Sequence, residues 1–154
     1  MSYYSSLEIS ASGLSAERLA MDVIANNIAN ANTTRTPQGG AFKRQLVVFA
    51  QKEGVPDPNS EEAGADPFDP TAPVKASVEG VQALGIVEDQ SPDRLVFDPG
   101  NPDADARGYV HYPNVEVVKE MVDLMAASRA YQANVAAIQA NRQMGSNDLS
   151  LLKS

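Results

Sequence analysis

The sequence predicts an α+β protein in which long α-helices at the two ends form a coiled-coil-like layer beside a small, irregular β-rich centre. All ten prolines of the 154-residue chain lie between Pro37 and Pro113, and a proline inside a helix costs about 3 kcal/mol. Apolar residues recur at helical spacing in both proline-free ends. We therefore divide the chain into an N-terminal helical segment, 1–36, a central region, 37–113, and a C-terminal helical segment, 114–154.

The N-terminal segment predicts one amphipathic helix. Its large apolar residues fall on one side of a helix, most of them seven positions apart: Leu7, Leu14, Met21, Ile24 and Ile28. The polar residues 32–34, followed by Pro37, predict where this helix ends.

The C-terminal segment predicts a longer helix, with Asn114 as its N-cap and Gly145 as a point where it frays. Its stripe alternates steps of four and three, as in coiled coils: Val117, Met121, Leu124, Ser128, Tyr131, Val135 and Ile138. A helix over 115–152 would be roughly 55–60 Å long, whereas a compact chain of this size is about 40 Å across. The helix should overhang its own domain. A second stripe on it also needs a partner: Val118, Val122 and Met125.

The centre predicts short strands separated by turn residues. The β-branched and aromatic runs are 46–49, 94–97 and 109–112, and a hairpin should join 74–79 to 81–87 across a glycine. Residues 53–73 differ, because they hold six acids, five prolines and no cation. Such a composition buries too little apolar surface to fold. We expect a flexible acidic loop there, which acts as an electrostatic spacer.

Several function classes are disfavoured by composition. The net charge of −8 argues against nucleic acid and anionic membranes as partners, and the absence of cysteine excludes thiol catalysis. No apolar run is long enough to enter a membrane, and residues 1–6 show no secretory signal. His111 is expected to be structural, and the acidic turn 98–105 lacks the ligand spacing of a calcium loop. We therefore expect no catalytic residue, metal or cofactor.

Three amides stand close together near the end of the first helix: Asn26, Asn27 and Asn30. Amides donate and accept hydrogen bonds and carry no charge to desolvate. Between closely packed helices they can fix the register, as a buried asparagine does in a coiled coil. The alternative is a frayed helix end.

Residues 12–14 (Ser-Gly-Leu) and the asparagine-rich run 26–33 resemble the N-terminal signature of the bacterial flagellar rod and hook proteins. Residues 114–122 and 128–135 resemble the C-terminal signature of the same axial family. The middle of the chain, above all 91–102, is similar to the short basal-body rod proteins of the proximal rod.

This resemblance implies a non-enzymatic structural subunit, whose terminal helices form the inner layer of a tube and are disordered before assembly. It implies export without cleavage by the flagellar type III apparatus and a place in the periplasmic rod, the drive shaft of motility. Implied partners are copies of itself, the other proximal and distal rod proteins, the adapter at the membrane ring and the rod-capping protein. Two alternatives stay open: another rod or hook-junction subunit, or a soluble monomeric ligand-binding or enzymatic domain.

We expect the apolar stripes of the two helices to pack on each other and, through their remaining positions, on neighbouring subunits. A head-to-tail contact that does not close produces an open helical tube. The expected assembly interface comprises Leu7, Leu14, Met21, Ile24, Asn26, Asn27, Ile28, Asn30, Val117, Met121, Leu124, Arg129, Tyr131, Asn134, Val135 and Ile138.

Overall fold

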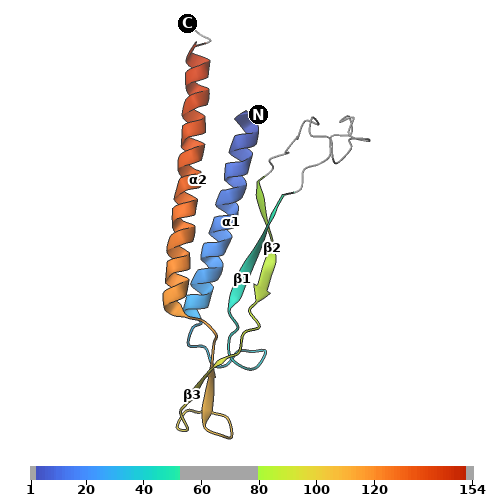
Figure 1. Ribbon diagram of the computed structural model, residues 1–154, viewed down its shortest axis with the longest axis vertical. Coiled ribbons are helices and arrows are strands. Elements are labelled where there is room, and N and C mark those ends of the chain that lie inside the picture. Colours follow the sequence, from blue (N-terminus) through green and yellow to red (C-terminus); the bar gives the residue numbers. More distant parts are fainter. Residues whose placement is uncertain (1–2, 53–79, 152–154) are drawn as a thin grey trace, which may run out of the picture.

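The computed structural model describes residues 3–52 and 80–151 of the chain. It is elongated, with two long helices side by side and two small antiparallel sheets (Figure 1). The elements follow the order α1 (Tyr3–Ala29), β1 (Gln45–Gln51), β2 (Val81–Glu88), β3 (Arg94–Phe97), β4 (Tyr109–Tyr112) and α2 (Val117–Leu151). The α+β fold predicted from the sequence is confirmed.

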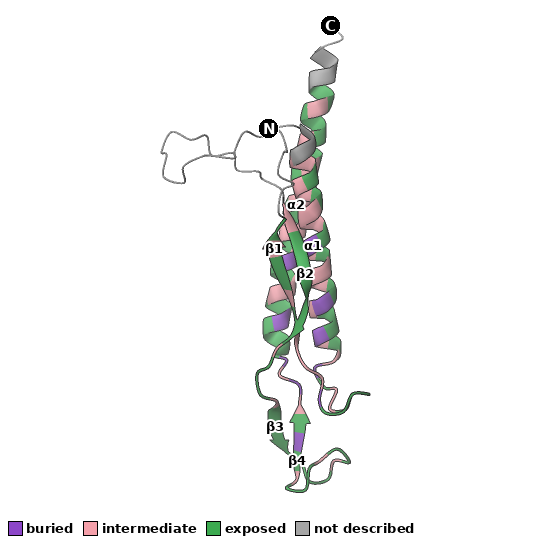
Figure 2. Cartoon of the chain, turned by 90° about the vertical axis from the view of Figure 1, so that its right-hand side faces the viewer, coloured by how far each residue is buried: buried purple, intermediate pink, exposed green. Residues whose placement is uncertain are grey.

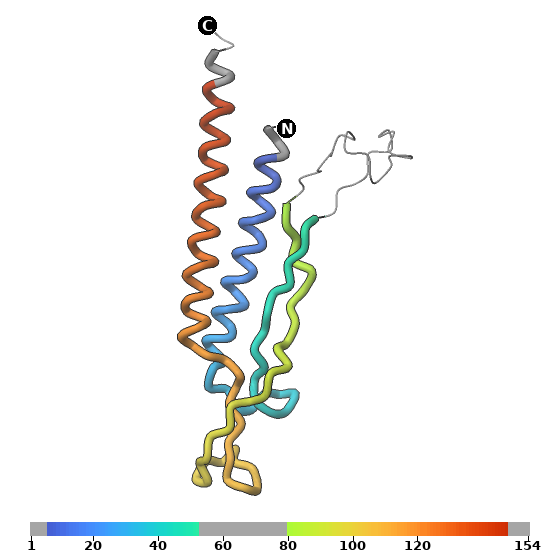
Figure 3. Tube along the Cα trace, viewed as in Figure 1, coloured from blue at the N-terminus to red at the C-terminus, as the bar shows by residue number. Residues whose placement is uncertain are grey.

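The molecule has three layers, because α1 lies between α2 on one side and the β1–β2 ribbon on the other (Figures 1 and 3). The two helices are antiparallel, so α1 begins at the same end of the molecule at which α2 finishes. With 35 residues, α2 is about 52 Å long at 1.5 Å per residue. It extends past the start of α1, which confirms the predicted overhang (Figure 1).

The β1–β2 ribbon is a pair of antiparallel strands in which Gln45 lies opposite Glu88 and Gln51 lies opposite Val81. The register shifts between Val48 and Phe49. There the partners are Gly85 and Ala83, so Leu84 between them is the extra residue of a β-bulge.

The second ribbon, β3–β4, lies beyond the other end of the helices (Figure 1). Val110 at its centre is completely buried. Phe97 and Tyr109 pack edge to face with their ring centroids 5.3 Å apart, and the Arg94 guanidinium lies over the Tyr112 ring. These cross-strand pairs stabilise a ribbon that has little else to pack against.

The interior is small and is made mostly of small residues. The buried apolar residues are Ala16, Val23, Ala31, Ala41, Val110, Val115 and Ala127. Figure 2 shows them near the end where α1 finishes and α2 begins, and in β4. Neither described helix combines the length and hydrophobicity that crossing a bilayer requires.

Two sequence predictions need correction. Asn114 is not the N-cap, because α2 begins at Val117; its Oδ1 instead accepts a hydrogen bond from the Arg44 amide. Gly145 does not fray the helix, which continues to Leu151. The strand at 81–87 is confirmed, and it pairs with β1. Its expected hairpin partner, 74–79, and the acidic loop, 53–73, lie outside the described residues.

Candidate assembly surfaces

The seam between α1 and α2 is built from small and polar residues. A Cβ atom added to Gly13 would lie 2.8 Å from Nδ2 of Asn134, so the side chain of Asn134 on α2 lies directly against α1 at Gly13. Ala16 and Ala127 are buried on the same helices. Small side chains allow two helix backbones to approach each other, whereas large ones would hold them apart.

This seam explains why several predicted interface residues lie at its margins. Five large residues of α1 are half-buried: Leu7, Leu14, Met21, Ile24 and Ile28. On α2 the same is true of Leu124, Tyr131, Asn134, Val135 and Ile138. Val117 and Met121 do not pack against α1 and are 40% and 54% exposed. Within the single chain, buried Glu120 and Ala127 mark the side of α2 that faces α1, and the role of Val117 and Met121 in assembly stays a prediction.

Asn27 joins three elements at the buried end of the helix pair, and its exposed fraction is only 1%. Its Oδ1 accepts from the Gln45 amide at 2.9 Å, and its Nδ2 donates to the Gln45 carbonyl at 2.8 Å. The same nitrogen donates to Oε2 of Glu120 at 3.0 Å. The amide therefore ties α1 to the start of β1 and to α2, as the register hypothesis predicted.

The other two amides act more locally. Asn26 donates to the side chain of Gln45 at 3.1 Å. Asn30 donates back to the carbonyl and side chain of Asn26 and accepts from the Thr33 hydroxyl. Both residues fix the turn after α1, and only Asn27 bridges the helices.

Arg44 completes the buried polar junction. Its Nε lies 2.6 Å from Oε1 of Glu120, a carboxylate with no exposed surface. The guanidinium also approaches Asp123 at 3.5 Å and Asp89 at 3.8 Å. A buried carboxylate is stable only when it is paired and hydrogen-bonded. The contacts with Arg44 and Asn27 meet both conditions for Glu120.

This junction was not predicted from the sequence, where neither Glu120 nor Arg44 was singled out. The available signal was a charged residue at a position that helical spacing places on the side of α2 that faces α1.

Ser12, next to Gly13, faces the opposite side of α1. Its hydroxyl accepts from the Val81 amide at 3.1 Å and donates to the Ile9 carbonyl at 2.7 Å. A Cβ atom on Gly80 would lie 2.3 Å from this hydroxyl. The Ser-Gly pair therefore lets α1 contact the β1–β2 ribbon with one residue and α2 with the next.

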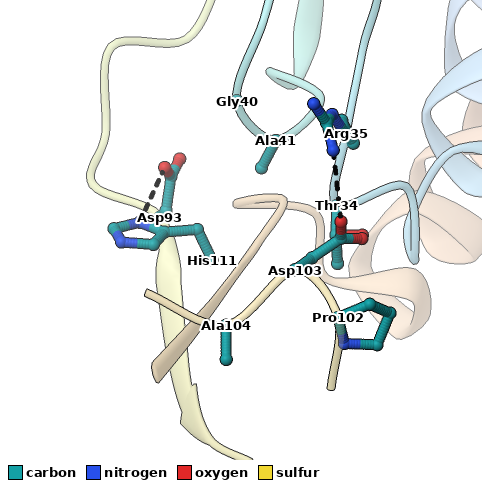
Figure 4. A pocket seen from close by; sticks show the side chains of 9 residues that line it. All are labelled: Thr34, Arg35, Gly40, Ala41, Asp93, Pro102, Asp103, Ala104 and His111. Atoms are coloured by element: carbon teal, nitrogen blue, oxygen red, sulfur yellow. Dashed lines mark hydrogen bonds and ion pairs between the residues drawn. The ribbon is translucent and has the colours of Figure 1, made fainter. Parts of the chain in front are cut away.

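An open hollow of about 460 Å³ separates the turn after α1 from the β3–β4 ribbon (Figure 4). Across it, the Thr34 hydroxyl donates to Asp103 at 2.7 Å. His111, which is half exposed, has its Nδ1 3.4 Å from Asp93, and Lys43 also pairs with Asp93. Polar contacts thus hold the β3–β4 ribbon to the rest of the molecule. In the described ranges, 3–52 and 80–151, no three potential metal-binding side chains gather.

Two carboxylates, half-buried Asp89 and exposed Asp105, have pKa values below the ordinary 3.8. Hydrogen bonds from the Ser91 hydroxyl and amide lower the pKa of Asp89, and nearby Arg44 acts in the same direction. The amides of Tyr109 and Arg107 donate to Asp105 at 2.9 and 2.8 Å and lower its pKa. Asp105 thereby organises the loop between β3 and β4, and the segment 98–105 forms successive turns.

The chain leaves two apolar surfaces uncovered. The first lies on α2, on the side away from α1, and consists of Val117, Val118, Met121, Val122 and Met125. The second lies on the β1–β2 ribbon, where large apolar side chains stay exposed on both faces of the strands: Leu46, Val48, Phe49, Leu84, Ile86 and Val87. Extended apolar surface of this kind marks interaction sites in folded proteins.

Comparison with known proteins gives matches along almost the whole chain. Residues 7–35 match the family described as flagella basal body rod protein, and residues 106–151 match the C-terminal family of flagellar basal body rod FlgEFG proteins. The flagellar basal-body rod protein FlgC of Borreliella burgdorferi is 41% identical over 99% of both chains. FlgC of Bacillus subtilis is 40% identical over 94% of both chains. FlgC of Escherichia coli O6:H1 is 39% identical over 94% of this chain and 93% of its own.

Proposed function

We propose, from the premise that this chain belongs to the FlgC family of flagellar basal-body rod proteins, that it is a subunit of the proximal rod and polymerises through its two terminal helices. The assembled rod would act as the drive shaft that transmits torque for motility. Members of this family are structural rod proteins, so the enzymatic alternative is set aside.

The observation that carries the proposal is the uncovered apolar surface of α2. Val118, Val122 and Met125, the stripe predicted to need a partner, are all more than half exposed. Burial of a side chain of this size contributes about 1.5–3 kcal/mol. A contact that covers several of them therefore favours association strongly, and the small interior of the single chain offers no other place for them.

Torque transmission requires a stiff subunit, and the α1–α2 pair supplies one. The helices run together over most of their length (Figure 3), and the Asn27–Glu120–Arg44 junction joins them to β1 at one end. Many such pairs packed side by side would resist twisting. The β3–β4 ribbon and the turn 98–102 would form an outer contact layer that fixes the tilt of each subunit.

We assign the assembly role to the three segments 1–36, 37–113 and 114–154, with the interface residues at the two helical ends. The proposed partners are copies of this chain, other rod proteins of the proximal and distal rod, the adapter at the membrane ring and the rod-capping protein. We place the rod portion in the periplasm, reached through the type III export apparatus without a cleaved signal.

Substitution of Ile28 tests the proposal in cells that produce only the variant. Ile28→Asp puts a charge beside the half-buried helix seam and should abolish both rod assembly and swimming, whereas Ile28→Leu keeps the apolar bulk and should preserve both. Electron microscopy of purified basal bodies and a swimming assay measure the outcome. Normal rods and swimming with Ile28→Asp would contradict assembly through the helices.

A further inference from the structure

We propose that the uncovered apolar face of α2 is the seat for the β1–β2 ribbon of a second copy of this chain. The face is defined as Val117, Val118, Met121, Val122 and Met125. This inference rests on the proposed function and deepens it, because it names which surface of one subunit contacts which surface of the next.

The five residues of the α2 face lie together on one side of the helix. Their spacing of one, three and four positions places them on adjacent turns, and their exposed fractions range from 40% to 71%. Buried Glu120 and Ala127 mark the other side, which faces α1. The face is therefore directed away from the molecule, and no described element covers it.

The β1–β2 ribbon offers an apolar surface on the other side of the three-layered molecule (Figure 3). Its six large apolar side chains are between 36% and 65% exposed. The bulge increases the local twist and displays Leu84, the most exposed of the six. A two-stranded ribbon that is covered only by α1 has too little packing to bury such side chains.

The two surfaces match in length. From Val117 to Met125 the helix rises about 12 Å at 1.5 Å per residue. The β2 segment from Leu84 to Val87 spans about 10 Å at 3.3 Å per residue. One short stretch of strand therefore matches the face in length, with Ile86 directed to one side of the ribbon and Val87 to the other.

Charges at the edges of the two surfaces are opposite in sign. Lys119 and Arg129 flank the α2 face, at positions three or four residues from its members, and both are exposed. Glu88 ends β2 and is also exposed. None of these three forms an ion pair within the described part of the chain, although Lys119 lies near enough to Asp89 of its own chain to help lower the pKa of that carboxyl. A second copy placed with its ribbon on the α2 face can bring Glu88 toward either cation.

The placement of the surfaces also favours a second copy in head-to-tail order. Because the α2 face and the ribbon lie on opposite sides of α1, a subunit that receives a ribbon still presents its own ribbon to the next subunit. Such a heterologous contact continues along an assembly. Contact between two α2 faces would instead close into a dimer and end the growth.

Cysteine cross-linking tests this contact directly, because the chain contains no cysteine. Cells that lack the native protein would produce two variants together, Met121→Cys and Ile86→Cys, and their basal bodies would be purified under mild oxidation. We expect a disulfide between position 121 of one copy and position 86 of another, identified by mass spectrometry of the joined peptides. Ala126→Cys, exposed on another side of the same turn, replaces Met121→Cys in the control and should give no such product.

The other outcomes overturn the inference in distinguishable ways. A dominant link between two copies of position 121, or a link from position 121 to a different rod protein, shows another occupant of the α2 face. Rods that contain the chain but give no 121–86 link overturn this inference alone, whereas absence of the chain from purified rods overturns the proposed function as well.

A charge exchange gives a second measurement. Lys119→Glu should reduce the yield of rods at least several-fold, and Glu88→Lys in the same chain should restore it.

Discussion

Glu120 uses both of its carboxylate oxygens, so Glu120→Gln should destabilise the junction although it preserves the shape of the side chain. One oxygen accepts from Nε of Arg44 at 2.6 Å, and the other accepts from Nδ2 of Asn27 at 3.0 Å. Glutamine has one acceptor and one donor, and either orientation turns its amide hydrogens toward another donor. Asn27 cannot rotate to accept, because both ends of its amide are bonded to the backbone of Gln45.

The size of the effect follows from burial. Removing one partner of a fully buried ion pair costs about 3–5 kcal/mol, but here Arg44 keeps Asp89 and Asp123 nearby and one hydrogen bond survives. One buried donor left without an acceptor costs about 1–3 kcal/mol. We therefore expect a loss of about 2–3 kcal/mol, equivalent to roughly 5–10 °C in the melting temperature of a chain of this size.

The assay is thermal unfolding followed by the helical circular dichroism signal, at one protein concentration because association shifts the midpoint. Asp123→Asn is the matched control: this carboxylate contacts the same guanidinium from the next turn of α2, but its side chain is 44% exposed. Its loss should cost no more than about 1 kcal/mol. If the two variants melt within 2 °C of each other, the assigned role of the buried carboxylate is wrong.

Three further predictions concern glycines and one loop. Gly13→Val places a branched side chain against α2 and should cost about 1–3 kcal/mol in the same melting assay; an unchanged midpoint would argue against close helix approach there. Gly80→Ala and Gly39→Ala both replace a glycine with φ near +90°, but only the first also collides with α1. Gly80→Ala should therefore lower the midpoint clearly more, and equal effects would contradict the contact. Asp105→Asn should speed amide hydrogen exchange at Tyr109 at pH 6. The lowered pKa of Asp105 means that its stabilisation is present above pH 3.8 and fades as the pH falls through the folded-state value. The difference between variant and wild type should therefore vanish in strong acid, and a difference independent of pH would exclude the charged carboxylate as its source.

The sequence predicted the features that depend on local chemistry. Proline placement and helical periodicity located both helices, and β-branched runs located the four described strands. Local pattern cannot show which strand pairs with which, and so the pairing of β2 with β1 was not predicted.

The helix seam shows the same limit more sharply. Large apolar residues were predicted as the contact, since burying them yields the most energy. The structure leaves those of α1 half-buried and buries Ala16 and Ala127, and the side chain of Asn134 lies against Gly13. The burial of Glu120 could not be predicted, because it depends on the ion pair with Arg44, which is 76 positions away in the sequence.

The antiparallel helix pair gives the molecule a head and a foot of different chemistry. The start of α1 and the end of α2 lie at the head, where α2 extends further, while the β3–β4 ribbon with its charged hollow forms the foot (Figure 1). A column of such subunits stacked in one orientation exposes different surfaces at its two ends. A newly arriving subunit therefore meets a different surface at each end of the column. Directional elongation would then be a property of the monomer's shape.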